Sequence, residues 1–170
     1  TSELPEASVA HCGLPALVSG DRRSALENIG ANLRRLRGAA PGTIVFPCGS
    51  CLLMFKRNIP FLFKEGHPLH DDAAFVAERA TDYASFILDS GVVDMLPEPP
   101  PAGRPGEIGY HDSCHLTGTL GKGPEARRVL KAAVGDAFAE MRGADLCCGY
   151  GGTFNIRDYA TSSKIGENKV

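Results

Sequence analysis

The sequence predicts an α/β protein with short parallel sheets flanked by helices, arranged as two related cysteine-rich lobes. Two observations support this fold class. Short apolar runs of strand length alternate with longer segments of helical periodicity, an order typical of parallel sheets covered by helices. Six cysteines fall into two similar groups, and a Pro- and Gly-rich stretch at 97–106 separates them. We therefore expect one cysteine-rich repeat within 1–96, a linker at 97–106 and the start of a second repeat at 107–170.

The first long helix is predicted to begin after Asp21, a good N-cap residue, and to run to about Arg37. Gly38 is expected to end it, and Pro41-Gly42 to form a turn. Residues 12–20, ahead of the cap, are expected to be a loop. The helix would bury one face, on which apolar side chains recur at helical spacing: Ala25, Leu26, Ile29, Leu33 and Leu36.

A buried strand is predicted at Thr43–Phe46, a short apolar run that ends at Pro47. Cys48 would then lie at the carboxyl end of this strand. A short helix should follow from about Cys51 to Arg57. A longer helix is predicted from Asp71 or Asp72 to about Ser90, with an inner face made of Val76, Ala80, Tyr83, Phe86 and Ile87.

The same order of elements returns after the linker. Glu107–His111 is predicted to be a strand, and Cys114 follows it. A helix is expected over 124–134, a short strand over 137–141, and a last helix from about Asp158. Both cysteine groups thus lie in loops that follow predicted strands. In open parallel sheets, ligands bind at the carboxyl ends of the strands, so this placement favours a ligand site.

The composition excludes some classes of function. The 170 residues are 43% hydrophobic and 22% charged, which is ordinary for a globular protein. A net charge of -2 without a basic run gives no signature of nucleic-acid binding. The chain has no apolar stretch of membrane-spanning length, so we expect no direct membrane insertion. A disulfide framework is disfavoured because the chain can bury a core without such crosslinks.

The cysteines themselves indicate soft-metal chemistry. Cys12 is followed by Cys48 and Cys51 in the motif PCGSC, and Cys114 is followed by Cys147 and Cys148 in LCCGYGG. A CxxC turn alone also suits zinc or a redox dithiol. The adjacent pair is better matched to an iron–sulfur cluster, because neighbouring side chains diverge and suit two irons better than one tetrahedral ion.

These motifs resemble those of a known family. CGLPALVSGD, PCGSC, YHDSCHL and LCCGYGGTFNIRD are similar to segments of the CCG, or cysteine-rich domain, proteins. That family includes the iron–sulfur subunits of lactate-utilisation and glycolate-oxidase systems and one of the subunits of heterodisulfide reductase. The resemblance covers nearly the whole chain, and the CCGYGGTF stretch is most similar to the lactate-utilisation branch.

The chain departs from the family pattern in three places. His11 stands where the first CCG motif has a cysteine, so His11 is a candidate metal ligand beside Cys12. The leading cysteine of the first repeat would precede Thr1, and the closing CxxC of the second repeat would follow Val170. We therefore expect the chain to be a central segment of a longer protein.

The resemblance implies an iron–sulfur oxidoreductase subunit that transfers electrons during oxidation of lactate, glycolate or a similar 2-hydroxy acid. The implied cofactor is an iron–sulfur cluster of [4Fe-4S] type, cubane or noncubane. Its ligands would come from Cys12, Cys48, Cys51, Cys114, Cys147 and Cys148. The implied partners are flavoprotein or other iron–sulfur subunits, in the cytoplasm or at the membrane through those partners. A disulfide-reductase subunit of the heterodisulfide type and a zinc-binding structural module, with zinc at the first site, remain alternatives.

Overall fold

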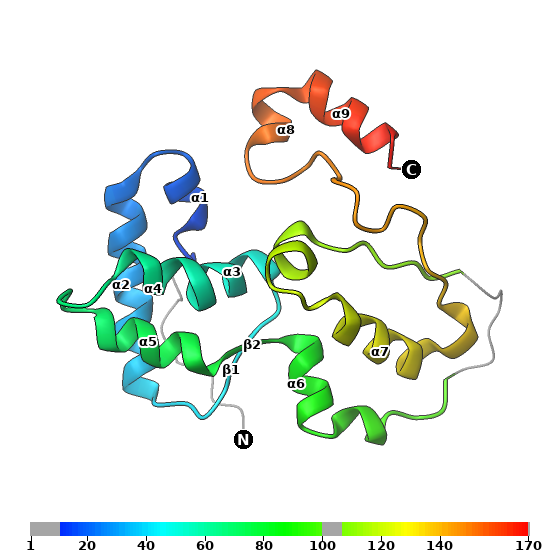
Figure 1. The fold of residues 1–170 in the computed structure, drawn as a ribbon, viewed down its shortest axis with the longest axis horizontal. Helices are drawn as coiled ribbons and strands as arrows, with labels where there is room; N and C mark the ends of the chain where they lie inside the picture. The colour runs from blue at the N-terminus through cyan, green and yellow to red at the C-terminus, as the bar shows by residue number, and fades with distance from the viewer. Residues whose placement is uncertain (1–10, 100–106, 170) are drawn as a thin grey trace. The chain divides into compact units, whose positions relative to one another are not determined.

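The computed structural model describes residues 11–99 and 107–169. Within these ranges the chain is mainly helical, with a small sheet of two parallel strands flanked by helices (Figure 1). This confirms the predicted α/β class. The chain divides into two compact units between Thr81 and Asp82. That division lies ahead of the 97–106 stretch, most of which falls outside the described residues, and the repeat boundary there stays a prediction.

The first unit opens with a short helix, α1 (Leu14–Val18), in a segment that the sequence predicts to be loop. The following helix, α2 (Arg22–Ala39), begins where predicted, since the Asp21 carboxylate accepts a hydrogen bond of 3.1 Å from the Ser24 N–H. Gly38 does not end α2. The helix instead ends beside Ala40, whose φ of 44° is left-handed, because the proline at position 41 disfavours helical geometry in the residue before it.

Strand β1 (Ile44–Phe46) matches the predicted strand, and a helical segment follows it directly. This segment is longer than the sequence predicts. It begins with α3 (Gly49–Leu53), passes through one π-helical stretch, η1 (Met54–Asn58), and closes with α4 (Ile59–Leu62). The chain therefore turns from the end of β1 into a helix within two residues, and both cysteines of PCGSC lie at this turn.

The prediction of one long helix ending near Ser90 is wrong, because a strand interrupts this segment. It consists of α5 (His70–Arg79), strand β2 (Ala80–Asp82) and α6 (Tyr83–Asp89). Two side-chain interactions support the interruption. The Lys56 ammonium donates to the Ala80 carbonyl at 2.6 Å, and the Asp82 carboxylate accepts from the Ser85 N–H at 2.9 Å. Pairing of β2 with β1 replaces the helical hydrogen bonds lost there.

The core of the first unit lies where α5 packs against α2 on one side and against the helical segment after β1 on another. Ile29, Leu33 and Val76 have no exposed surface, in agreement with the helical faces predicted for them. Cys12 is partly buried and packs against this core. The buried residues that form it are Ile29, Leu33, Ile44, Met54, Phe55, Ile59, Phe63, Ala73 and Val76.

The second unit has helices but less regular strand pairing than predicted. After α6 come η2 (Val92–Met95), a π-helical turn η3 (Cys114–Thr119), α7 (Gly123–Val134) and η4 (Gly135–Ala137). The strands predicted at 107–111 and 137–141 are reduced to one parallel bridge between Ile108 and Phe138. The strand pairing does not continue beyond this bridge. The next hydrogen bond between the two segments joins the Asp112 N–H to the Ala144 carbonyl at 3.0 Å, four residues after Ile108 but six after Phe138.

Two helices close the described chain, α8 (Phe154–Arg157) and α9 (Tyr159–Glu167), and lie together in Figure 1. The Asp158 carboxylate caps α9 by accepting from the Thr161 N–H at 3.1 Å, so the predicted start of the last helix is confirmed. The apolar residues of this unit are less deeply buried than those of the first, and among its most buried side chains are the polar ones of Asp112 and Ser162.

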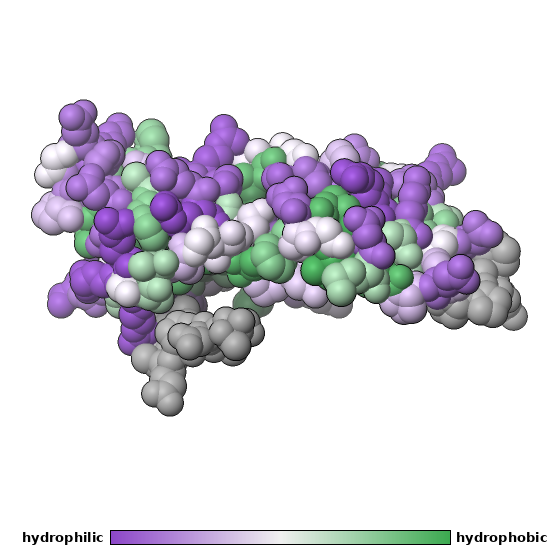
Figure 2. Space-filling model, turned by 90° about the horizontal axis from the view of Figure 1, so that it is seen from below, coloured by the Kyte–Doolittle hydropathy of each residue, from purple (hydrophilic) through white to green (hydrophobic). Residues whose placement is uncertain are grey.

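The surface is mixed in character. On the face shown in Figure 2, hydrophilic side chains prevail and apolar ones gather in small patches. Several large apolar side chains are nevertheless well exposed, including those of Phe61, Met95 and Ile156. Across the described ranges, no helix combines the length and the apolar character needed to cross a membrane.

Candidate metal centre

Cys12 is held against α2 by the glycine that follows it. Gly13 has a φ of 85°, a left-handed conformation that favours glycine. A Cβ at this position would lie 2.7 Å from Ile29 Cγ1 and 3.1 Å from the Ala25 carbonyl oxygen. A glycine is therefore needed both for the backbone conformation and for the close approach of the loop to α2.

Cys48 and Cys51 lie at the turn from β1 into α3. Cys48 is the N-cap residue of α3, with extended backbone angles (φ −109°, ψ 118°), and its thiol is exposed. Cys51 lies one helical turn further and is half-buried. The sequence prediction that these cysteines follow the carboxyl end of a strand is thus correct.

The Cys51 thiol interacts with both other cysteines of the first unit. Burial raises the pKa of Cys51, and the neighbouring thiols of Cys12 and Cys48 raise it further, to about 12. Cys48 behaves in the opposite way. Burial opposes its ionisation, but hydrogen bonds to its sulfur from the backbone N–H groups of Cys51 and Ser50 bring its pKa below the usual value. Three free thiols therefore gather here, and the backbone favours thiolate at Cys48.

This cysteine group does not have the compact arrangement of a single-ion site. Within the described part of the chain, no set of three or more His, Cys, Asp or Glu side chains is disposed to hold one metal ion. A single zinc ion with metal–sulfur bonds of about 2.3 Å would require its thiolates to lie within roughly 4 Å of one another. A cluster distributes its cysteine ligands over several irons and so tolerates wider spacing.

His11 is engaged through both of its ring nitrogens. Nδ1 accepts a hydrogen bond of 3.1 Å from the Gly13 N–H, and Nε2 lies 3.2 Å from the Asn28 amide nitrogen. The Asn32 amide also donates to the His11 carbonyl oxygen at 3.2 Å. These contacts tie the residue ahead of Cys12 to α2. A metal bond to His11 would first require one of its ring nitrogens to lose its partner.

The second cysteine group lies on two chain segments that are bonded to each other. The Asp112 N–H donates to the Ala144 carbonyl at 3.0 Å, and the His111 Nδ1 lies 3.1 Å from the same oxygen. Cys114 follows the first segment at the start of η3, and Cys147 follows the second. This contact gives His111 a structural role in joining the two segments. Cys114 and Cys147 are exposed, and Cys148 is half-buried.

Gly149 locks the Cys147-Cys148 loop onto α9. Its φ of 79° is left-handed, and a Cβ there would overlap the Ser162 carbonyl oxygen and lie 3.2 Å from Ile165 Cβ. The buried Ser162 hydroxyl donates to the Gly149 carbonyl at 2.8 Å. The Gly149 N–H also lies 3.4 Å from Cys147 Sγ, so the loop backbone offers a donor to that sulfur.

The two units have the same local arrangement around one of their cysteines. In each, a left-handed glycine follows a cysteine, packs tightly on a helix, and is succeeded by a short helix and an aspartate cap. Gly13 with Asp21 in the first unit corresponds to Gly149 with Asp158 in the second. This shared arrangement supports the prediction that the two cysteine-rich lobes are related.

A charged network fixes the segment ahead of Cys114. Arg127 on α7 donates to both oxygens of Asp112, at 2.9 and 2.6 Å, and to both oxygens of Glu140, at 2.7 and 2.5 Å. These hydrogen bonds hold the pKa of Asp112 below its usual value, although burial opposes the shift. Thr117 in η3 adds a bond of 2.8 Å to the same carboxylate. The network thus joins α7, the Cys114 turn and the segment at Glu140.

Lys169 fixes the segment ahead of Cys147 in a different way. Its ammonium donates to three carbonyl oxygens, those of Gly143, Ala144 and Leu146, at 2.8 to 3.0 Å. Sequence inspection identified all six cysteines but not Arg127, Asp112 or Lys169. Nothing in their spacing along the chain distinguishes them, because their partners are distant in sequence.

Both cysteine groups match one known protein family. A model of the cysteine-rich domain family, CCG, matches residues 7–56 and 108–170. The chain belongs to the cysteine-rich domain family. Each of the two matched ranges contains one cysteine group and one of the two glycine-locked loops.

Curated relatives agree with this assignment. Lactate utilization protein A of Geobacillus thermodenitrificans is 30% identical over 168 residues, 99% of this chain and 67% of that protein. Lactate utilization protein A 2 of Bacillus mycoides is 33% identical over the same shares of both chains. Lactate utilization protein A of Anoxybacillus flavithermus is 33% identical over 170 residues, 100% of this chain and 68% of that protein. No solved structure matches the chain.

Proposed function

We propose that this chain is the iron–sulfur electron-transfer component of an oxidoreductase that oxidises lactate or a similar 2-hydroxy acid. The observation that carries the proposal is the contact of the Cys51 thiol with both Cys12 and Cys48 at the end of β1. Relatives named for lactate utilization, at 30 to 33% identity over nearly the whole chain, support the choice of substrate class.

The donor set of the chain fits an iron–sulfur cluster. Cys12, Cys48 and Cys51 would hold one cluster in the first unit, and Cys114, Cys147 and Cys148 would hold another in the second. Thiolates favour soft metal centres, iron–sulfur clusters among them, and half-buried thiols beside backbone N–H donors suit such clusters. When bound, a [4Fe-4S] cluster, cubane or noncubane, supplies a site that stores and releases single electrons.

The protein's own contribution is to place the Cys51 thiol next to those of Cys12 and Cys48 in the first unit, and to leave cysteines of both groups at the surface. Binding of metal would have to release the proton of Cys51, whose pKa is raised. Cys48, Cys114 and Cys147 are exposed, so electrons can leave through that edge to a partner. We propose flavoprotein or other iron–sulfur subunits for this role, in the cytoplasm, with any membrane contact made by those partners.

Metal analysis of the anaerobically purified protein tests the ligand assignment. We expect iron and acid-labile sulfide in similar amounts, little zinc, and an EPR signal on reduction. Cys51→Ser should remove the iron of the first site and spare that of the second, whereas Cys148→Ser should do the reverse. Each variant is the control for the other. Zinc without sulfide, or equal iron in both variants and the parent, would contradict the proposal.

The direction of electron flow needs a separate measurement. With a purified flavoprotein partner and lactate present, the EPR signal of the reduced protein should develop within the assay. With lactate absent, the signal should stay small. If a disulfide substrate reoxidises the protein and lactate does not reduce it, the heterodisulfide-reductase type of function is the correct one.

His11→Ala is expected to leave the iron content unchanged, because both ring nitrogens already have protein partners. The loss of two hydrogen bonds on a part-exposed histidine should lower the free energy of unfolding by about 1 kcal/mol. Iron analysis and urea unfolding of the same sample check both expectations. A loss of iron from the first site at unchanged stability would instead make His11 a ligand.

A further inference from the structure

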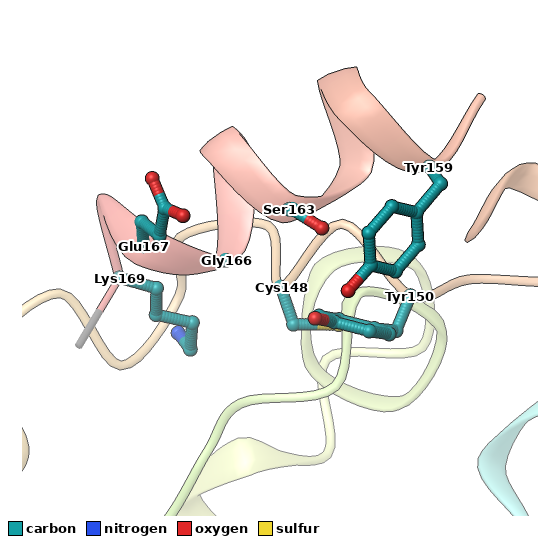
Figure 3. A pocket seen from close by; sticks show the side chains of 7 residues that line it. All are labelled: Cys148, Tyr150, Tyr159, Ser163, Gly166, Glu167 and Lys169. Carbon is teal, nitrogen blue, oxygen red and sulfur yellow. The ribbon is translucent and has the colours of Figure 1, made fainter.

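A cavity of about 540 Å³ lies beside Cys148, between the loop that follows this cysteine and α9. Its volume is within the range of small-molecule sites, roughly 300–1,000 Å³. Figure 3 shows the side chains around it, with those of Tyr150 and Tyr159 next to Cys148. The lining residues all belong to the second unit: Cys148, Tyr150, Tyr159, Ser163, Gly166, Glu167 and Lys169.

Two aromatic side chains that line this cavity are largely exposed to solvent. Tyr150 is 55% exposed and Tyr159 is 68% exposed. Tyr150 is nevertheless well placed, because a Cβ on Gly166 would lie only 3.0 Å from its Cε2 atom. The glycine thus lets the ring lie close against α9. Exposed tyrosine faces beside a cavity are suited to stacking on a flat ring.

The lining of the cavity includes a buried polar group without a hydrogen-bond partner among the described residues. The Ser163 hydroxyl oxygen is buried, and no residue in the described ranges forms a hydrogen bond with it. In Figure 3 this hydroxyl points from α9 toward the tyrosine side of the cavity. A buried hydroxyl without a partner is costly, so a ligand that accepts its hydrogen bond would gain binding free energy.

The charges at the cavity disfavour an anionic ligand. The Lys169 ammonium already donates to three backbone carbonyl oxygens. Glu167 adds a carboxylate to the same lining. A phosphate group would therefore lie near an ammonium whose hydrogen bonds go to backbone carbonyls, and near a carboxylate that repels it. The lining instead fits a neutral ligand with a flat ring and a carbonyl oxygen.

We propose that this cavity binds a neutral, planar, conjugated ring that carries a ring carbonyl, as quinones and the isoalloxazine ring of flavins do. The ring would lie against Tyr150 and Tyr159, and its carbonyl would accept from the Ser163 hydroxyl. A ring bound beside Cys148 would lie next to the second cluster of the proposed function. A redox role for this site therefore rests on the proposed function. Binding itself requires only the cavity.

Equilibrium dialysis of the anaerobically purified protein tests the proposal, with menadione and riboflavin as the two probes and iron measured in the same samples. We expect saturable binding of at least one probe, and the probe that binds identifies the ring type. Tyr150→Leu and Tyr159→Leu should each weaken it about tenfold, the loss expected for one aromatic contact. Tyr83→Leu, which removes an exposed tyrosine on α6, should leave binding unchanged.

Two further variants separate the site from general stability. Ser163→Ala should weaken binding of the carbonyl-bearing probe about fivefold and leave binding of 2-methylnaphthalene, which lacks a carbonyl, unchanged. Gly166→Ala should displace the Tyr150 ring and weaken binding, while α9 stays folded because alanine favours a helix. Binding that persists in samples without iron upholds the site independently of the second cluster. Failure of both probes to bind, or tyrosine variants that bind as well as Tyr83→Leu, would overturn the proposal.

Discussion

Gly149→Ala is expected to lower the free energy of unfolding of the second unit by about 3 kcal/mol. The left-handed φ of 79° costs an alanine roughly 1–2 kcal/mol. Its Cβ would also overlap the Ser162 carbonyl oxygen, which belongs to the backbone of α9 and cannot rotate away. Overpacking of this kind costs about 1–3 kcal/mol. Urea unfolding followed by circular dichroism measures the loss.

Gly151→Ala is the matched control for this prediction. Gly151 lies two residues further along the same loop, has no positive φ, and a Cβ there would meet nothing within 4 Å. We therefore expect no measurable loss of stability. Gly13→Ala should fall between the two, because its nearest contact is the Ile29 side chain, which can adjust. Equal stability of the variants at positions 149 and 151 would show that the loop is not locked on α9.

Arg127→Met is expected to destabilise the second unit by about 3 kcal/mol. Asp112 is buried and receives two hydrogen bonds from the guanidinium. Removal of one partner of a buried ion pair leaves the other charge without compensation, which typically costs about 3–5 kcal/mol. The lower end applies here because Thr117 still donates to the carboxylate. Because the network holds the turn before Cys114, the variant should also lose iron from the second site first.

Arg128→Met is the control, since it removes the neighbouring, exposed charge on the same helix. We expect its unfolding midpoint to match that of the parent protein. Arg127→Lys should recover only part of the loss, because an ammonium cannot form the paired hydrogen bonds that a guanidinium forms with a carboxylate. An Arg127→Met protein with parental stability and full iron content would refute the role given to this network.

The helices that the sequence predicted well are those whose ends have local signals. Asp21 and Asp158 each cap a helix through the N–H three residues ahead, so the start of α2 and of α9 could be predicted without tertiary information. The strand β1 has a short apolar run and a following proline, which are also local. The end of α2 was harder to predict, because Pro41 and not Gly38 determines it.

The predicted helix across β2 shows the opposite case. Val76 and Ile87 fit one helical face and are buried as expected, whereas Tyr83, predicted on the same face, is exposed. The chain nevertheless leaves the helix at Ala80, where the Lys56 ammonium and strand β1 provide partners from elsewhere in the sequence. Periodicity alone cannot reveal this, because a strand of three residues does not disturb the spacing of the apolar positions around it.

The sequence by itself determined the family, the six candidate ligands and the helices with local caps, because these depend on motifs and on residues three or four positions apart. Only the tertiary structure decided which groups support those ligands. It brought Cys51 against Cys12 and Cys48, joined Arg127 to Asp112, and placed Tyr150 and Tyr159 around one cavity. The physical reason is that hydrogen bonds, close packing and cavities form between segments distant along the chain, and their partners leave no signal in local spacing.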